Sequence, residues 1–239
     1  NTYAFVTRDM GKTWEDISGG MMNPARDIDE DPDNPNVLYL GTDYGVFVSI
    51  DKGKNWVNMS EDAPDVIIMD MDIQKRERDL ALATYGRGFY IIDIYPFKEF
   101  KPEVFEKDAY LFDTQRTVKW AMIERRGPSY GEFARAQNPP TEASFYFFLK
   151  GEVKSAKLVI KDLEGNLLRE INGKTAAGLQ KVRWNLRKRR EQTEGGQRQF
   201  RGRRGPSTVE AGTYKATLVV DDKEIVTKKF KVIDDPILK

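Results

Sequence analysis

Short segments with alternating apolar and polar positions run along most of the chain, which is the pattern of β-strands with one buried face. In the second half, turn residues such as those at 162–166 and 221–223 separate these segments. The segments there are 143–149, 156–161, 167–171, 180–186, 212–220 and 225–232. So many short strands over roughly 110 residues predict a β-sandwich. The first half carries similar β-forming runs, and we therefore predict an all-β protein.

An eight-residue pattern in the first half occurs twice. Residues 7–14 and 49–56 both read Ser/Thr-x-Asp-x-Gly-x-x-Trp, and Asp9 and Asp51 are 42 residues apart. The pattern suits a hairpin turn, because an Asp carboxylate accepts backbone N–H groups, Gly takes a positive φ and Trp can cover the turn. A repeat of about 40–50 residues is the period of one four-stranded propeller blade.

The two octets resemble the Asp-box, or BNR repeat, of sialidases, some endoglucanases and sortilin-type propellers. The residues that carry the resemblance are Asp9, Gly11, Trp14, Asp51, Gly53 and Trp56. It implies structural turns at the periphery of a β-propeller, with a metal or catalytic role for the aspartates as the alternative. A third echo at 80–93 resembles the segment that ends the last blade in these relatives. We expect residues 1–94 to be the C-terminal blades of an incomplete propeller.

The second half resembles an Ig-like domain of the secretion-sorting and flagellar-hook-cap kind, which follows the propeller in exported Asp-box proteins. The resemblance rests on residues 138–140, 182–187, 210–214 and 235–236. It implies an exported protein, periplasmic or at the cell surface. The expected organisation is therefore propeller blades at 1–94, a linker and docking segment at 95–137, and an Ig-like sandwich at 138–239.

The amino-acid composition limits the kinds of catalytic and metal-binding sites that this chain can form. The chain has 39 Lys and Arg against 38 Asp and Glu, which argues against nucleic acid as a partner, and it has neither Cys nor His. Thiol nucleophiles, disulfides, a Ser-His-Asp triad and His-ligated zinc are therefore excluded within this sequence. We assign no catalytic residue, no metal and no cofactor. No run of 18 apolar residues is present, so we predict no membrane span.

An acidic stretch at 27–33 could indicate a calcium-binding loop. Its prolines and the lack of EF-hand spacing instead favour an inter-strand turn. Asp70, Asp72 and Asp93 alternate with apolar residues, which would place carboxylates on one strand face. Such a pair can serve glycosidase acid–base work, although solvent-facing strand edges are the simpler interpretation.

Arginines are the candidate ligand-binding residues. Between 183 and 204 there are nine basic residues against two acidic ones, so this segment could grip acidic glycans or another acidic partner, or be a solvated hairpin loop. Arg87, between two glycines, could clamp a substrate carboxylate in a propeller channel or simply close the last strand. The candidates are Arg87, Arg187, Arg189, Arg190, Arg201, Arg203 and Arg204.

Three functions fit these observations. We prefer a non-catalytic exported binding or scaffold protein, part of a larger assembly. The alternatives are a sialidase- or endoglucanase-like glycoside hydrolase with catalytic residues mostly upstream, and a polyanion-binding module built on the Arg-rich segment. Because Asn1 falls inside a blade, we expect the remaining blades to come from an upstream segment or another chain, with other proteins as further candidate partners.

Overall fold

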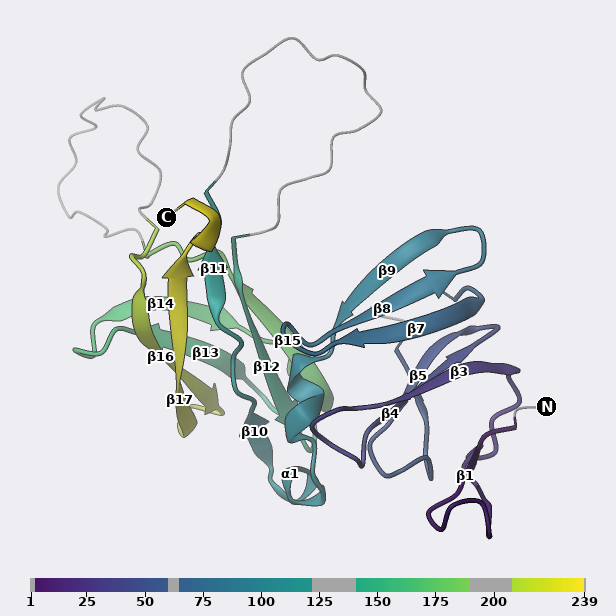
Figure 1. The fold of residues 1–239 in the computed structure, drawn as a ribbon. Helices are drawn as coiled ribbons and strands as arrows, with labels where there is room; N and C mark the ends of the chain where they lie inside the picture. Colours follow the sequence, from purple (N-terminus) through teal and green to yellow (C-terminus); the bar gives the residue numbers. More distant parts are fainter. Residues whose placement is uncertain (1–2, 60–64, 122–140, 190–207, 239) are drawn as a thin grey trace, which may run out of the picture. The chain divides into compact units, whose positions relative to one another are not determined.

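A computed structural model describes residues 3–59, 65–121, 141–189 and 208–238 (Figure 1). Within these residues nearly all regular structure is β-strand, with one short α-helix, α1 (Pro102–Glu106), and 3-10 turns such as η1 (Tyr95–Glu99). The all-β prediction is thus confirmed. The chain divides into two compact units, Asn1–Val104 and Phe105–Lys239. Among the described residues, no helix has the length and hydropathy that a membrane crossing requires.

The described residues of the first unit form three antiparallel sheets. A two-stranded sheet pairs β1 (Phe5–Val6) with β2 (Glu15–Asp16). A four-stranded sheet has the order β3 (Ala25–Glu30), β4 (Leu38–Thr42), β5 (Gly45–Ser49) and β6 (Val57–Asn58). The third sheet has the order β7 (Ile68–Gln74), β8 (Asp79–Thr84) and β9 (Gly88–Asp93). Each sheet is a meander, in which strands adjacent in sequence are also hydrogen-bonded neighbours.

The second and third sheets are copies of one module. The β3–β4 ladder shifts register between Ala25 and Asp27, and the β7–β8 ladder shifts between Ile68 and Asp70. In both, the one-residue irregularity lies at the start of the first strand. The β1–β2 pair likewise corresponds to β5–β6, because each encloses one Asp-box octet. Within the described residues the third sheet has no fourth strand, and β9 is the last strand in its order.

In the second unit, the residues that the structure describes form two sheets. One has the order β10 (Ala109–Leu111), β12 (Ala143–Leu149) and β15 (Gly178–Trp184). The other has the order β11 (Thr117–Lys119), β17 (Lys223–Asp234), β16 (Gly212–Val220), β13 (Ala156–Lys161) and β14 (Leu167–Asn172). Its strands are antiparallel except β11, which runs parallel to β17.

The assignment of 95–137 to a linker needs correction. Leu111 of β10 lies opposite Phe147 of β12, and Thr117 of β11 lies opposite Val232 of β17. β10 and β11 are thus edge strands of the two sheets in the second unit. The compact unit therefore begins at Phe105 rather than at residue 138. The partner strands lie far away in the sequence, which is why the local pattern did not reveal the pairing.

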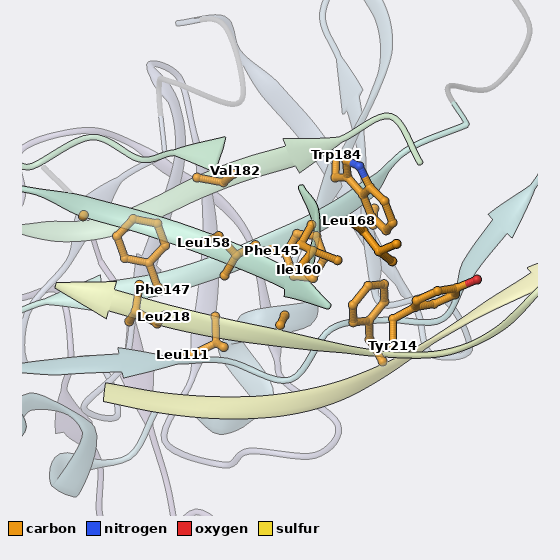
Figure 2. Close-up of a cluster of buried hydrophobic side chains, with 14 of the residues drawn as sticks. Leu111, Phe145, Phe147, Leu158, Ile160, Leu168, Val182, Trp184, Tyr214 and Leu218 are labelled. Atoms are coloured by element: carbon orange, nitrogen blue, oxygen red, sulfur yellow. The ribbon is translucent and has the colours of Figure 1, made fainter. Parts of the chain in front are cut away.

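The core of this unit lies between its two sheets (Figure 2). Phe145, Phe147 and Trp184 of the smaller sheet are buried together with Leu158 and Leu218 of the larger one. Alternate residues along the strands point inward, as expected for a sandwich.

Tyr214 adds a feature typical of Ig-like sandwiches. Its hydroxyl donates to the Glu210 carbonyl over 2.6 Å, which matches the tyrosine corner in which a Tyr near a strand start bonds back to the preceding backbone.

Candidate functional site

Both Asp-box carboxylates are held by local hydrogen bonds of the same pattern. Asp9 Oδ1 accepts from the Thr13 N–H at 2.8 Å and Asp9 Oδ2 from the Thr13 hydroxyl at 2.7 Å. Asp51 Oδ1 accepts from the Asn55 N–H at 2.9 Å and Asp51 Oδ2 from the Asn55 amide at 2.7 Å. The aspartates therefore close their own turns. The residue before each Trp completes the pattern, a role that the sequence analysis did not assign.

Backbone geometry explains the glycines of the octets. In the turns, Met10 and Lys52 have φ values of 60° and 65°, and Gly11 and Gly53 have φ values of 87° and 86°. Two consecutive left-handed residues are costly for side chains with a Cβ, so a glycine at the second position relieves part of that cost.

The pKa values of the two aspartates reflect this setting. The side-chain hydrogen bond from Thr13, followed by that residue's backbone N–H, lowers the pKa of Asp9. Burial opposes ionisation of Asp51, but the hydrogen bonds from Asn55 and Ser49 outweigh it and the pKa of Asp51 is also lowered. Both groups are thus bonded carboxylates at neutral pH, with no property of a general acid.

The two Asp-box tryptophans differ, and for Trp14 the structure departs from the sequence expectation. Trp56 is half-buried, and its indole N–H donates to the Ile17 carbonyl at 2.7 Å. A Cβ on Gly19 would lie 2.7 Å from the Trp56 ring. Trp14, in contrast, is 63% exposed. The Trp56 indole therefore packs against residues 17–19, which follow the first octet, whereas most of the Trp14 side chain is exposed.

We expect Trp56→Ala to lower the free energy of unfolding by about 2–3 kcal/mol, because it removes a half-buried ring and a hydrogen bond. Trp14→Ala is the matched control and should change stability by less than about 0.5 kcal/mol. Urea denaturation of the purified variants measures both. Equal losses for the two variants would contradict the role assigned to Trp56.

The arginine candidates are placed differently from one another. Arg87 is exposed in the β8–β9 turn, between Gly86 and Gly88 with φ values of 79° and 75°. Arg187 forms an isolated bridge with Thr208, and the Arg189 N–H donates to the Leu168 carbonyl at 2.8 Å. Arg87 thus belongs to the first unit, whereas Arg187 and Arg189 belong to the second. Arg190, Arg201, Arg203 and Arg204 lie outside the described residues.

Acidic side chains gather on β3 and β7. Asp27 Oδ2 accepts from the Met71 N–H at 2.7 Å and so joins the two sheets. Burial raises the pKa of Asp29, and the carboxylates of Asp27, Asp72 and Asp70 raise it further. A raised carboxyl pKa is one property of a general acid, but a perturbed pKa alone assigns no reaction. Among the described residues no group of three or more acids is arranged to hold a metal.

The acidic stretch at 27–33 also contains a buried polar hub. Asp31 is 1% exposed; its Oδ1 accepts from the Asn34 N–H, and its Oδ2 accepts from the Tyr39 hydroxyl and the Arg78 guanidinium. Asn34 in turn donates to the carbonyls of Phe97 and Phe100 at 3.0 and 2.7 Å. Burial, then the Asp31 charge, raises the pKa of Tyr39. Residues 27–30 of this stretch belong to β3, and the inter-strand turn begins only at Asp31, whose buried carboxylate is structural.

Comparisons with known proteins identify no family. No protein-family model and no curated protein matches the chain. It aligns over 97% of its length with 28% of the extracellular domain of a hybrid two-component system from B. thetaiotaomicron, at 10% identity and a TM-score of 0.28. It aligns over 52% of its length with 30% of a Pseudomonas fluorescens alkylpurine DNA glycosylase bound to DNA with an abasic site analog, at 11% identity and a TM-score of 0.20. Similarities this low carry no argument about function.

Proposed function

We propose that this chain is a non-catalytic, exported binding or scaffold protein whose first unit supplies the last blades of an Asp-box β-propeller. The remaining blades would come from an upstream segment of the same gene product or from another chain. The repeated sheet module and the local bonding of Asp9 and Asp51 support the propeller-type architecture. The Asp-box resemblance supports export.

One observation carries the proposal: equivalent faces of the repeated module differ in burial. On the four-stranded sheet, Val46 and Val48 are 1% and 6% exposed. At the same register positions of the next sheet, Phe89 and Ile91 are 81% and 63% exposed. Two large apolar side chains in alternate positions of one strand form an exposed patch of the kind that marks an interface.

The covered copy indicates what would cover the exposed one. A Cβ on Gly41, which lies opposite Val46, would be 2.8 Å from Ile68 Cγ2 and 3.3 Å from Met71 Sδ. Strand β7 of the following sheet therefore packs directly on this face. By the same repeat logic, the Phe89–Ile91 face should receive the first strand of a further sheet. A strand added along the outer edge of β9 would also extend this sheet through backbone hydrogen bonds.

The test is a photo-crosslinking amino acid placed at position 89 of the natural gene product in its native host. We expect a crosslink to a β-strand of a further sheet repeat, in the same polypeptide or in a partner chain. The same probe at the exposed position Leu163, in the second unit, is the matched control and should not give this product. If position 89 gives no crosslink, or one to a segment without the repeat, the proposal fails.

The hydrolase alternative has a separate test. The parent protein should not cleave fluorogenic sialosides or cello-oligosaccharides. Cleavage that Asp29→Asn abolishes would instead assign the acidic cluster a catalytic role and overturn the non-catalytic proposal.

A further inference from the structure

Three lysines stand in one row across the larger sheet of the second unit. Lys161 of β13 lies opposite Lys215 of β16, and Lys215 lies opposite Lys229 of β17. Their neighbours Ile160, Tyr214 and Phe230 belong to the buried core. Because successive side chains on a strand point to opposite faces, the three lysines project from the outer face of the sheet. We call Lys161, Lys215 and Lys229 the lysine row.

Such a row is unfavourable for the fold by itself. Directly opposed residues in antiparallel strands have Cα atoms about 4.5–5.5 Å apart, and like charges at that spacing destabilise a sheet. Lys231, the next outward residue of β17, extends the positive charge opposite Thr213. A surface selected only for solubility would intersperse the two signs of charge.

Acidic side chains nearby compensate only part of this charge. Lys161 Nζ is 4.0 Å from Glu224 Oε1, whose side chain is 68% exposed, and an exposed pair at that distance is weak. Glu170 lies opposite Val159, two residues before Lys161 on β13. Lys215 Nζ donates to the Leu163 carbonyl at 3.1 Å, so a backbone dipole holds it. In the described part of the chain, no ion pair reaches Lys215, Lys229 or Lys231.

We propose that the lysine row, with Lys231, binds an anionic polysaccharide. The row is an array of point charges on the outer face of the sheet, and the exposed Thr227 lies beside it, with its hydroxyl bonded over 2.8 Å to that of the buried Thr217. Carboxylates or sulfates would meet the ammonium groups, and a sugar hydroxyl would meet Thr227.

Two further observations support this ligand class. The outward residues of β13, β16 and β17 include no aromatic side chain, whereas single-stranded nucleic acids are bound by basic grooves combined with aromatic stacking. Beyond Lys161, which lies opposite Leu167, the Leu168 carbonyl accepts from the backbone N–H of Arg189, so one further basic residue lies next to β14. The site stands independently of how the first unit is completed.

The experiment measures binding of the full chain to heparin by calorimetry at several salt concentrations. The test variant carries Lys161→Gln, Lys215→Gln and Lys229→Gln. The control variant carries Lys12→Gln, Lys54→Gln and Lys75→Gln, which are exposed lysines of the first unit and give the same change in net charge. The slope of log K against log salt concentration is negative, and we expect its magnitude to decrease by about 2–3 in the test variant, because each lost contact removes about one unit. The control should bind like the parent.

Several outcomes would overturn the proposal. They are equal binding by the parent and the test variant, an equal loss in both variants, and tighter binding of single-stranded DNA than of heparin at matched charge. A third variant, with Arg190, Arg201, Arg203 and Arg204 changed to Gln, tests the Arg-rich segment separately. Loss of binding in that variant alone would also overturn the proposal. The test variant should keep the thermal unfolding temperature of the parent or exceed it, because it removes repulsion between neighbouring strands.

Discussion

Replacing Arg78 with methionine is expected to lower the free energy of unfolding of the first unit by about 3–5 kcal/mol, the usual result of removing one member of a buried ion pair. The Arg78 and Asp31 side chains are 4% and 0% exposed. Methionine keeps most of the volume but leaves the Asp31 carboxylate buried beside Tyr39 with its charge uncompensated. Urea denaturation, followed by the fluorescence of Trp56 in the same unit, measures the change.

A double variant distinguishes the cost of leaving the Asp31 charge without its Arg78 partner from the cost of lost side-chain packing. Adding Asp31→Leu to Arg78→Met removes the stranded charge and should recover part of the stability, so that the two losses are strongly non-additive. Tyr39→Phe removes only one hydrogen bond and should cost about 1 kcal/mol. A loss below about 1 kcal/mol for Arg78→Met would show that this pair does not hold the turn in place.

The contrast between this hub and the Asp-box turns shows what the sequence could reveal. The carboxylate hydrogen bonds of each Asp-box form within its eight residues, because Asp9 and Asp51 accept from residues only four positions further along the chain. Asp31 instead meets Arg78, 47 residues away. The local sequence around Asp31 favoured a turn, which is what the structure has. The residues near Asp31 in the sequence do not indicate that the Arg78 guanidinium compensates the buried Asp31 charge.

The same distinction applies to the strands and to the candidate site. The segments at 143–149, 156–161 and 212–220 were predicted with the bounds that the structure has, because a long alternating pattern marks a half-buried strand. β10 and β11 contain three residues each, too few to show a period, so their place in the sandwich was missed. The lysine row was also missed, because its members come from three separate strands and meet only through the sheet register.

A fragment of residues 105–239 is expected to fold cooperatively by itself, whereas a fragment of residues 138–239, the sandwich as the sequence delimited it, is expected not to fold. The shorter fragment lacks β10 and the residue after it, and so loses Leu111 and Phe112, which are both 0% exposed. Truncating a buried Leu or Phe to Ala costs about 2–5 or 3–5 kcal/mol. Together these losses approach the whole stability of an ordinary domain, about 5–15 kcal/mol.

Heating each fragment while recording near- and far-ultraviolet circular dichroism distinguishes the outcomes. The longer fragment should show one cooperative transition and the fixed aromatic signals of a packed core, which contains Phe145, Phe147 and Trp184 (Figure 2). The shorter fragment also exposes the edges of β12 and β17 that β10 and β11 pair with, and unpaired strand edges promote association. It should therefore aggregate or lack a transition. The prediction is wrong if the shorter fragment unfolds cooperatively at a transition temperature within a few degrees of that of the longer one. In that case β10 and β11 would not be needed for a stable sandwich.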